Sequence, residues 1–237
     1  MRSSETRLEP PQSMEIALRL LARNGYESTT VDELADAAQI SRSTFFRRFG
    51  SKDDIVFADH DFLIERLQAQ LSDYLGDPLT AVLEGTRQVL DYHLRRPETS
   101  RLRHGLLQQN PVLRDRELIT SYRYERCIAD FLRIALPDAP EWARLAYASS
   151  VVSTHNFELR GWLRDPAEDA AGALHTELRQ LVQVFQPLLA PDTDADTAGG
   201  AGALPAPARQ VIVAFVQPGE TPAQALRDIA QSLESEA

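Results

Sequence analysis

The chain has 237 residues, of which 43% are hydrophobic, and it carries a formal net charge of −10. This length accommodates a small domain and a larger one, each with its own core. There is no apolar run long enough to span a membrane and no signal-peptide pattern, and the single cysteine, Cys127, excludes an intramolecular disulfide. We therefore expect a protein of the reducing cytoplasm, with no membrane partner.

Short helices with clear N-terminal caps are predicted in the first quarter of the chain. Residues 1–11 show no such pattern and are expected to form a flexible arm. Thr30 opens a T-x-x-E capping box, Ser41 is placed to cap a second helix after a tight turn, and Ser51 opens an S-x-x-D cap. Residues 12–58 thus predict a helical domain that contains a helix-turn-helix.

The helix that follows Ser41 is the candidate recognition helix for DNA. Phe45 and Phe49 are four residues apart and are expected to face inward. Because a helix turns by about 100° per residue, the opposite side carries Arg42, Ser43, Phe46 and Arg47. The segment from Arg42 to Lys52 holds four basic residues and no acid. A basic outer side on such a helix predicts binding in the DNA major groove, and Lys52 lies at the next helix start, where phosphate is favoured.

A longer segment, ALRLLARNGYESTTVDELADAAQISRSTFFRRFGSKDDIV, resembles the N-terminal domain of the TetR family of transcriptional regulators. The matching features are Gly25-Tyr26, the Thr-Thr pair, the T-F-x-R-x-F core and the Ser-Lys-Asp that opens the next helix. The likeness runs without a gap over about residues 12–60. It implies an all-helical homodimer that represses transcription and whose C-terminal half binds a small effector, which releases the DNA.

The resemblance also assigns candidate DNA contacts. By motif position, Thr30, Phe46 and Lys52 would contact the phosphate backbone. The candidates to reach bases or phosphates are Arg42, Ser43, Thr44, Arg47 and Arg48. Phe46 departs from the family, which usually has Tyr at this position. The phosphate contact that the Tyr hydroxyl makes in the family is therefore missing here. The alternative is that Arg42, Arg47 and Arg48 only form a solvent-exposed side of the helix and do not bind DNA.

Prolines divide the rest of the chain into helical segments. The predicted helices are 51–75, 79–95, 99–108, 113–135, 141–164 and 167–188. With the first domain they predict an all-α fold, in which residues 59–190 form the effector-binding and dimerisation domain.

Two apolar stripes predict the dimer interface. The last helix carries Leu174, Leu178, Leu181, Phe185 and Leu188, and the helix before it offers Leu145, Ser149, Val152 and Asn156. Such narrow apolar stripes suit packing between helices. The two recognition helices of a dimer, about 34–36 Å apart, would recognise a palindromic operator in double-stranded DNA. The alternative is that both stripes belong to the core of one chain.

A basic island lies between Arg87 and Arg126, where nine Arg and two His stand against five acids. Apolar residues interleave with it, which suits an amphipathic anionic effector. This stretch is also loosely similar to TetR relatives that respond to acyl-CoA-like molecules. The predicted effector-binding residues are Arg103, His104, Leu107, Tyr122, Arg126, Phe131 and His155. The alternative, equally favoured, is that the arginines form surface ion pairs.

The last part of the chain predicts a different organisation. Residues 191–208 have the composition of a flexible linker. Residues 209–237 read as a short strand, a turn and an amphipathic helix. The TetR resemblance does not cover this strand-helix extension, which would pair across the dimer, dock another protein or stay disordered.

No constellation of catalytic residues is present. The five histidines are scattered, with no metal-binding spacing, and there is no G-x-S-x-G or phosphate-cradling glycine loop. We therefore predict no enzyme activity, no metal site and no cofactor. The remaining alternative to a DNA-binding regulator is a helix-turn-helix module that binds other proteins without an operator.

Overall fold

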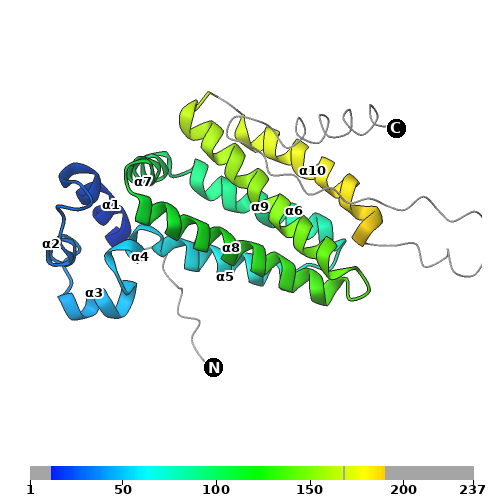
Figure 1. Cartoon of the computed structure of the whole chain (residues 1–237), viewed down its shortest axis with the longest axis horizontal. Helices are drawn as coiled ribbons and strands as arrows, with labels where there is room; N and C mark the ends of the chain where they lie inside the picture. The colour runs from blue at the N-terminus through cyan, green and yellow to red at the C-terminus, as the bar shows by residue number, and fades with distance from the viewer. Residues whose placement is uncertain (1–11, 168, 190–237) are drawn as a thin grey trace, which may run out of the picture. The chain divides into compact units, whose positions relative to one another are not determined.

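The computed structural model describes residues 12–167 and 169–189, and over these ranges every regular element is an α-helix. The helices are α1 (Gln12–Asn24), α2 (Val31–Ala37), α3 (Arg42–Phe49), α4 (Lys52–Val56), α5 (Ala58–Asp73), α6 (Pro78–Leu94), α7 (Pro97–Gln109), α8 (Pro111–Ala135), α9 (Glu141–Arg164) and α10 (Ala170–Leu189). Figure 1 shows this order along the chain. The all-α prediction is confirmed for the described part. The expected arm, linker and strand-helix extension lie outside the described residues.

The predicted caps form where the sequence places them. The Thr30 hydroxyl accepts from the backbone N–H of Glu33, and the Glu33 carboxylate accepts from the Thr30 N–H at 2.7 Å, which completes the capping box of α2. Ser41 caps α3 and Ser51 caps α4 through their side-chain oxygens. Each cap satisfies backbone N–H groups that have no partner inside the helix.

The single helix predicted over 51–75 is wrong in one respect, because the chain breaks it at Phe57. This residue has φ −115° and ψ 15°, outside the helical range, and separates α4 from α5. Ile55 and Val56 pack in the core around α1, whereas Leu63 and Leu67 pack in the core of the larger bundle. Serving two cores requires a change of direction, and no Pro or Gly marks it in the sequence.

Three of the later helices have a proline as their first residue. Pro78, Pro97 and Pro111 occupy the first turns of α6, α7 and α8. The sequence prediction started these helices one or two residues too late. Proline is tolerated there because its missing N–H would have no helical partner.

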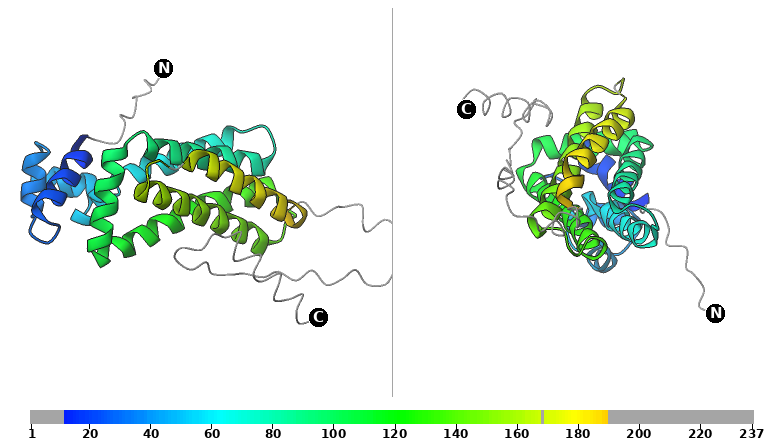
Figure 2. Two further views of the ribbon diagram at one scale, coloured as in Figure 1. Left: turned by 90° about the horizontal axis from the view of Figure 1, so that it is seen from above. Right: turned by 90° about the vertical axis from the view of Figure 1, so that its right-hand side faces the viewer.

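The helices α5, α6, α8, α9 and α10 form a bundle around the larger core, and α7 lies across the end of this bundle nearest α1 (Figures 1 and 2). Much of the two apolar stripes predicted for a dimer interface is used here within one chain. Leu174 and Leu178 are fully buried, Val152 is buried, and Ser149 donates to Glu125. The part of the prediction that assigned these residues to an interface is therefore wrong, since α9 and α10 pack on each other first. Leu145 and Val184 remain exposed on these helices.

The smaller core joins the first four helices to the bundle. Phe45, Leu34 and Leu18 are fully buried in it, and Phe57 is buried beside them. Leu106 and Leu107 from α7 and Leu113 from α8 belong to the same core. The first domain thus packs on the bundle through α1, which contacts α7, and through α4, which contacts α8.

Candidate functional site

The outer side of α3 carries the exposed side chains predicted to meet DNA. Phe45 and Phe49 are buried, as predicted, and their rings are 5.3 Å apart. Arg42, Ser43, Arg47 and Arg48 are exposed, and Phe46 is 41% exposed. The helix therefore presents a basic, largely polar side with one aromatic ring among its arginines.

Arg42 and Thr44 are already engaged in contacts with their surroundings. The Arg42 guanidinium donates to the Asp32 carboxylate on α2 at 2.6 Å and lies over the Phe46 ring, 5.3 Å from its centroid. Thr44 is half-buried, and its hydroxyl lies 2.9 Å from the capping hydroxyl of Ser41. A contact of Arg42 with DNA would replace this exposed ion pair, and such pairs contribute little stability.

Lys52 connects two parts of the helix-turn-helix. Its ammonium donates to the carbonyl oxygens of Tyr26 at 2.8 Å and Thr29 at 3.2 Å, and it lies 4.2 Å from the centroid of the Tyr26 ring. An ammonium has three donors, so these contacts leave one direction for a further acceptor. Lys52 is half-buried at the start of α4, where the first helical N–H groups attract anions.

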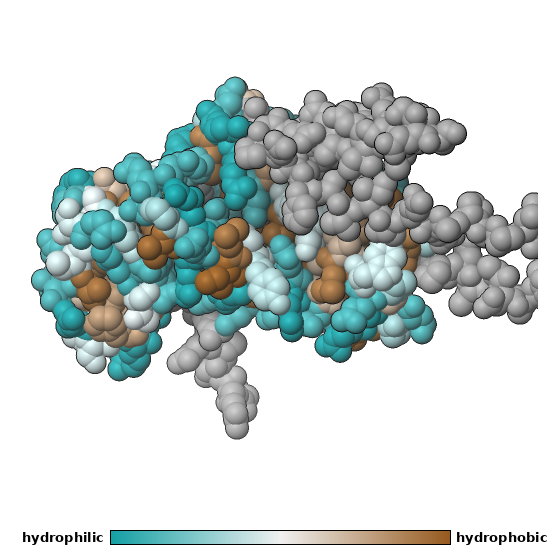
Figure 3. Space-filling view, viewed as in Figure 1, coloured by the Kyte–Doolittle hydropathy of each residue, from teal (hydrophilic) through white to brown (hydrophobic). Residues whose placement is uncertain are grey.

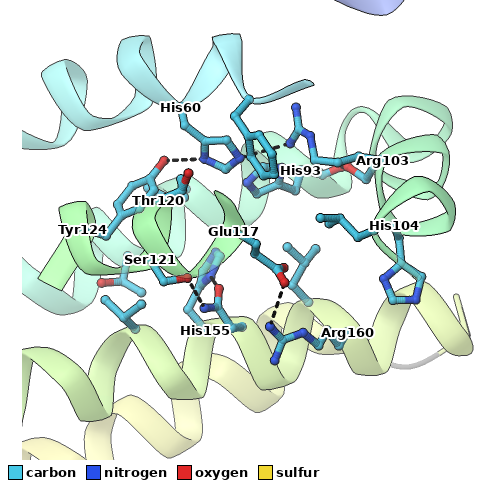
Figure 4. A pocket seen from close by; sticks show the side chains of 18 of the residues that line it. His60, His93, Arg103, His104, Glu117, Thr120, Ser121, Tyr124, His155 and Arg160 are labelled. Atoms are coloured by element: carbon cyan, nitrogen blue, oxygen red, sulfur yellow. Dashed lines mark hydrogen bonds and ion pairs between the residues drawn. The ribbon is translucent and has the colours of Figure 1, made fainter. Parts of the chain in front are cut away.

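A cavity of about 860 Å³, its open mouth included, lies between α5, α6, α7, α8 and α9. Figure 4 shows its polar side chains, among them His60, His93, Arg103, Tyr124 and His155. The remaining walls are mostly apolar. They include Leu67, Val89, Leu107, Ile128, Val152, Leu159 and Leu163.

The structure brings part of the predicted effector site together at this cavity. Arg103, His104, Leu107 and His155 line it. Tyr122, Arg126 and Phe131 do not line it. On α8 the cavity-facing residues follow helical spacing from Glu117 to Ile128, which turns Tyr122 and Arg126 to the outside. Phe131 packs at the edge of the larger core.

The outer side of α8 is where Tyr122 is found, beside other exposed apolar side chains. Leu118, Ile119 and Tyr122 are each more than half exposed. In the space-filling view, hydrophobic side chains reach the surface over this helix (Figure 3).

Arg103 is the buried cation of the cavity. Its Nη2 donates to both carboxylate oxygens of Asp59 at 2.6 Å, its Nε donates to the Val56 carbonyl at 2.9 Å, and its Nη1 lies 3.3 Å from His60 Nε2. Burial alone would raise the pKa of Asp59, but the charge and hydrogen bond of Arg103, together with smaller contributions from His60 and His93, outweigh it and lower that pKa to about 2. The pair is therefore ionised and internally neutralised.

Three histidines line the cavity wall, of which His93 and His155 are buried and the His60 side chain is 13% exposed. The His93 ring lies 5.6 Å from that of His60 and 6.1 Å from that of His155. Burial lowers the pKa of His60 and of His155 to about 4, and it lowers that of His93 well below its usual value. All three rings are neutral near pH 7. His60, His93 and Tyr124 were missed by the sequence analysis, because their spacing along the chain gives no sign that separate helices bring them together.

Several arginines of the basic island form ion pairs at the surface, whereas Arg114 donates to backbone carbonyl oxygens. Arg87 pairs with Glu84 and Asp91, and Arg123 pairs with Asp61 at 2.6 Å. Arg126 pairs with Asp130 at 3.7 Å. The alternative interpretation of the island therefore holds for these residues, and Arg103 is the exception. In the described part of the chain no cluster of His, Cys, Asp or Glu is arranged to hold a metal ion, and no helix is long and apolar enough to cross a membrane.

Comparison with known proteins matches the first domain to a defined family. Residues 14–58 match the sequence model of the "Bacterial regulatory proteins, tetR family". The transcriptional regulator MftR of Mycobacterium tuberculosis is 25% identical over 177 residues, which cover 70% of this chain and 85% of that protein.

Solved structures share the fold. The repressor FadR of Thermus thermophilus in complex with lauroyl-CoA is similar with a TM-score of 0.52 at 20% identity, covering 72% of this chain and 91% of that one. The SmeT–triclosan complex is similar with a TM-score of 0.55 at 16% identity, covering 73% and 88% of the two chains. The matched family and MftR are transcriptional regulators and not enzymes, in agreement with the sequence prediction. The capped helix-turn-helix, its basic outer side and the family match over residues 14–58 together identify the first domain as a TetR-type DNA-binding domain, and the chain as a DNA-binding transcriptional regulator similar to the TetR family.

Proposed function

We propose that this regulator is a repressor that binds operator DNA through α3 and leaves it when an effector occupies the cavity. Residues 12–58 would form the DNA-binding domain and residues 59–190 the effector and dimerisation domain, acting on chromosomal DNA in the cytoplasm. The observation that carries the proposal is Arg103, which lines the cavity and donates to Val56 at the end of α4. Through this contact, a ligand beside Arg103 acts directly on the helix that follows α3.

The exposed residues of α3 are the proposed source of sequence recognition. Arg42, Ser43, Arg47 and Arg48 would reach bases or nearby phosphates, because they are exposed on the outer side of the helix. Lys52, Thr30, Thr44 and Phe46 would contact the backbone or position α3. Lys52 and Thr44 already bond to their own domain, which favours a positioning role.

A homodimer would present two α3 helices to a palindromic operator. The exposed apolar residues Leu145 on α9 and Val184 on α10 support an interface on these two helices. Leu181, Phe185 and Leu188 are partly buried on the same helix and would add to it. Two recognition helices about 34–36 Å apart would then enter successive major grooves on one face of the duplex.

The effector would be an amphipathic molecule with an apolar body, and an acyl-CoA or fatty acid is the first candidate. The apolar walls suit an acyl chain, and Arg160, half-exposed and paired with Glu117 at 3.4 Å, would meet an anionic end. FadR, which has the same fold, holds lauroyl-CoA, whereas SmeT holds triclosan. The shared fold alone therefore does not choose the ligand.

Selection of bound sequences from random DNA duplexes tests the operator part of the proposal. We expect a palindrome. Arg42→Ala should relax the preference at one base position in each half-site, whereas Lys52→Ala should weaken binding to all sequences alike. Equal effects of the two substitutions would reject the division between base and backbone contacts, and the absence of any selected sequence would reject operator binding.

The effector part is tested on the full-length protein bound to that operator. Fluorescence anisotropy of labelled DNA is followed while acyl-CoAs and fatty acids of increasing chain length are added, with thermal shift as a second measure of binding. Release of DNA with a preferred chain length supports the proposal. Release by neutral compounds alone would reject the acyl anion, and release by no compound would reject ligand-controlled binding at this cavity.

A further inference from the structure

The wall of the cavity holds one buried polar atom without a partner. His155 lines the cavity and is 8% exposed, and its Nε2 has no hydrogen-bond partner among the described residues. Leaving a buried polar atom unpaired costs about 1–3 kcal/mol. Such an atom at a ligand cavity marks a place where a ligand group completes the hydrogen bonding.

The neighbours of His155 determine which kind of group fits. Asn156 donates through Nδ2 to the Ser121 hydroxyl at 3.1 Å, and its Oδ1 lies 3.2 Å from His155 Nδ1. An amide oxygen can only accept, so Nδ1 carries the ring proton and donates it to Asn156. The ring is neutral near pH 7 because burial lowers its pKa to about 4. Nε2 is therefore a bare acceptor, which a donor group of a ligand would satisfy.

The same reasoning assigns the hydrogen-bond donors and acceptors at the opposite end of the polar wall. Arg103 can only donate, so His60 Nε2, 3.3 Å from Arg103 Nη1, accepts. His60 Nδ1 then carries the proton and donates it to the Tyr124 hydroxyl oxygen at 3.0 Å. The proton of Tyr124 is left to donate elsewhere, and Tyr124 lines the cavity. The wall thus offers a donor at Tyr124 and an acceptor at His155 (Figure 4).

The charges around the cavity are compensated. Arg103 is paired with Asp59, and Arg160 is paired with Glu117. An ionised ligand group deep in the cavity would meet no uncompensated charge among these groups, and a carboxylate would face the lone pair of His155 Nε2. The buried part of the ligand is therefore expected to be uncharged.

We propose that the effector carries an uncharged hydroxyl, as in an alcohol or phenol, on its buried apolar part, and that this hydroxyl donates its proton to His155 Nε2. This inference rests on the proposed function, in which the cavity is the effector site. His155 selects the hydroxyl, and Asn156 acts as a positioning residue that keeps the ring proton on Nδ1. An anionic end, where the ligand has one, stays at the mouth near Arg160.

Two matched pairs of compounds test the inference on the full-length protein. The probes are 1-naphthol and 2-naphthol, each compared with its methyl ether, which keeps the oxygen and the apolar body but has no proton to donate. Isothermal titration calorimetry gives the affinities. At least one naphthol should bind roughly tenfold or more tightly than its ether. Equal binding within both pairs, tighter binding of the ethers, or no binding of either naphthol would overturn the inference.

Substitution of His155 assigns the preference to a residue. In His155→Leu the ratio between naphthol and ether should fall to about one, because the acceptor is gone. His175→Leu on α10, away from the cavity, is the matched control and should keep the wild-type ratio. Retained operator binding shows that each variant is folded. A ratio in His155→Leu equal to that of the wild type would overturn the assignment, and if this variant does not fold, the wild-type comparison alone still decides.

The same samples separate this inference from the proposed function. A naphthol that binds tightly but leaves DNA affinity unchanged would contradict ligand-controlled DNA binding and leave the hydroxyl preference standing. Release of DNA by an acyl compound, together with equal affinities within the naphthol pairs, would contradict only the hydroxyl preference.

Discussion

Arg103 on α7 and Asp59 on α5 form a buried ion pair in which Nη2 lies 2.6 Å from both carboxylate oxygens. Both side chains are at least nine-tenths buried. The pair stands between the cavity and the end of α4, because the same guanidinium donates to the Val56 carbonyl at 2.9 Å. In the mechanism that we propose, stability and signal transmission depend on the same contact.

Removal of one partner of this pair should be costly. Arg103→Met leaves the Asp59 carboxylate buried without its cation, and we expect a loss of about 3–5 kcal/mol in the free energy of unfolding. Urea denaturation measures it. Arg123→Met, which removes the exposed pair with Asp61, is the control and should cost less than about 1 kcal/mol. The double variant Asp59→Leu/Arg103→Met should recover part of the loss, and equal losses for the two single variants would contradict a buried, ionised pair.

Phe46→Tyr should strengthen DNA binding. Phe46 is 41% exposed on the outer side of α3, so an added hydroxyl reaches solvent and, in the complex, a phosphate. One hydrogen bond of about 0.5–1.5 kcal/mol corresponds to a rise in affinity of roughly twofold to tenfold. The slope of log K against log salt should not change, because a neutral hydroxyl releases no counterion.

Phe45→Tyr is the matched control for that experiment. Phe45 is fully buried, so its added hydroxyl would lack water and should lower the thermal midpoint without raising DNA affinity. Anisotropy titrations at several salt concentrations check both variants. No gain in affinity for Phe46→Tyr would show that this position does not face a phosphate.

Acid should destabilise the protein before its carboxylates titrate. Burial lowers the pKa of His60 and His155 from 6.5 to about 4, so the unfolded chain takes up protons first. Their contribution to stability is complete above pH 6.5 and is lost as the pH falls from 6.5 toward 4. The lowered pKa of Asp59 acts only below its ordinary value of 3.8. Urea unfolding at intervals across this range should show a declining free energy, less steep in His155→Leu. Constant stability down to about pH 4.5 would contradict neutral buried histidines.

The parts of the fold that were predictable depend on local interactions. The caps at Thr30, Ser41 and Ser51 involve residues three apart, and the inward Phe45 and Phe49 follow helical spacing. The helix break at Phe57 is not marked by a nearby Pro or Gly. It arises because the residues before it pack in one core and the residues after it pack in the other. Leu174 and Leu178, expected at the dimer interface, are buried by helices of the same chain. The periodicity of a helix does not show whether its apolar side packs within the chain or against a partner subunit.

The cavity was predictable only in part for the same reason. His60, His93 and Tyr124 come from α5, α6 and α8 and meet only after the bundle has packed. The charged residues around Arg103 look alike in the sequence, yet Arg123 and Arg126 form surface pairs while Arg103 is buried. Which arginine is buried depends on the crossing of α7 over the bundle, which no local pattern encodes.

The most direct test of the central claim is an anisotropy titration of the selected operator in which a releasing ligand is added to the wild type and to a variant with a filled cavity. Val152 lines the cavity and is buried, and Val152→Phe places a larger apolar side chain there without touching α3. We predict that both proteins bind the operator with similar affinity, that the ligand releases the wild type, and that Val152→Phe stays bound at ligand concentrations at least tenfold higher. Equal release of both proteins at the same ligand concentration would contradict control of DNA binding from this cavity.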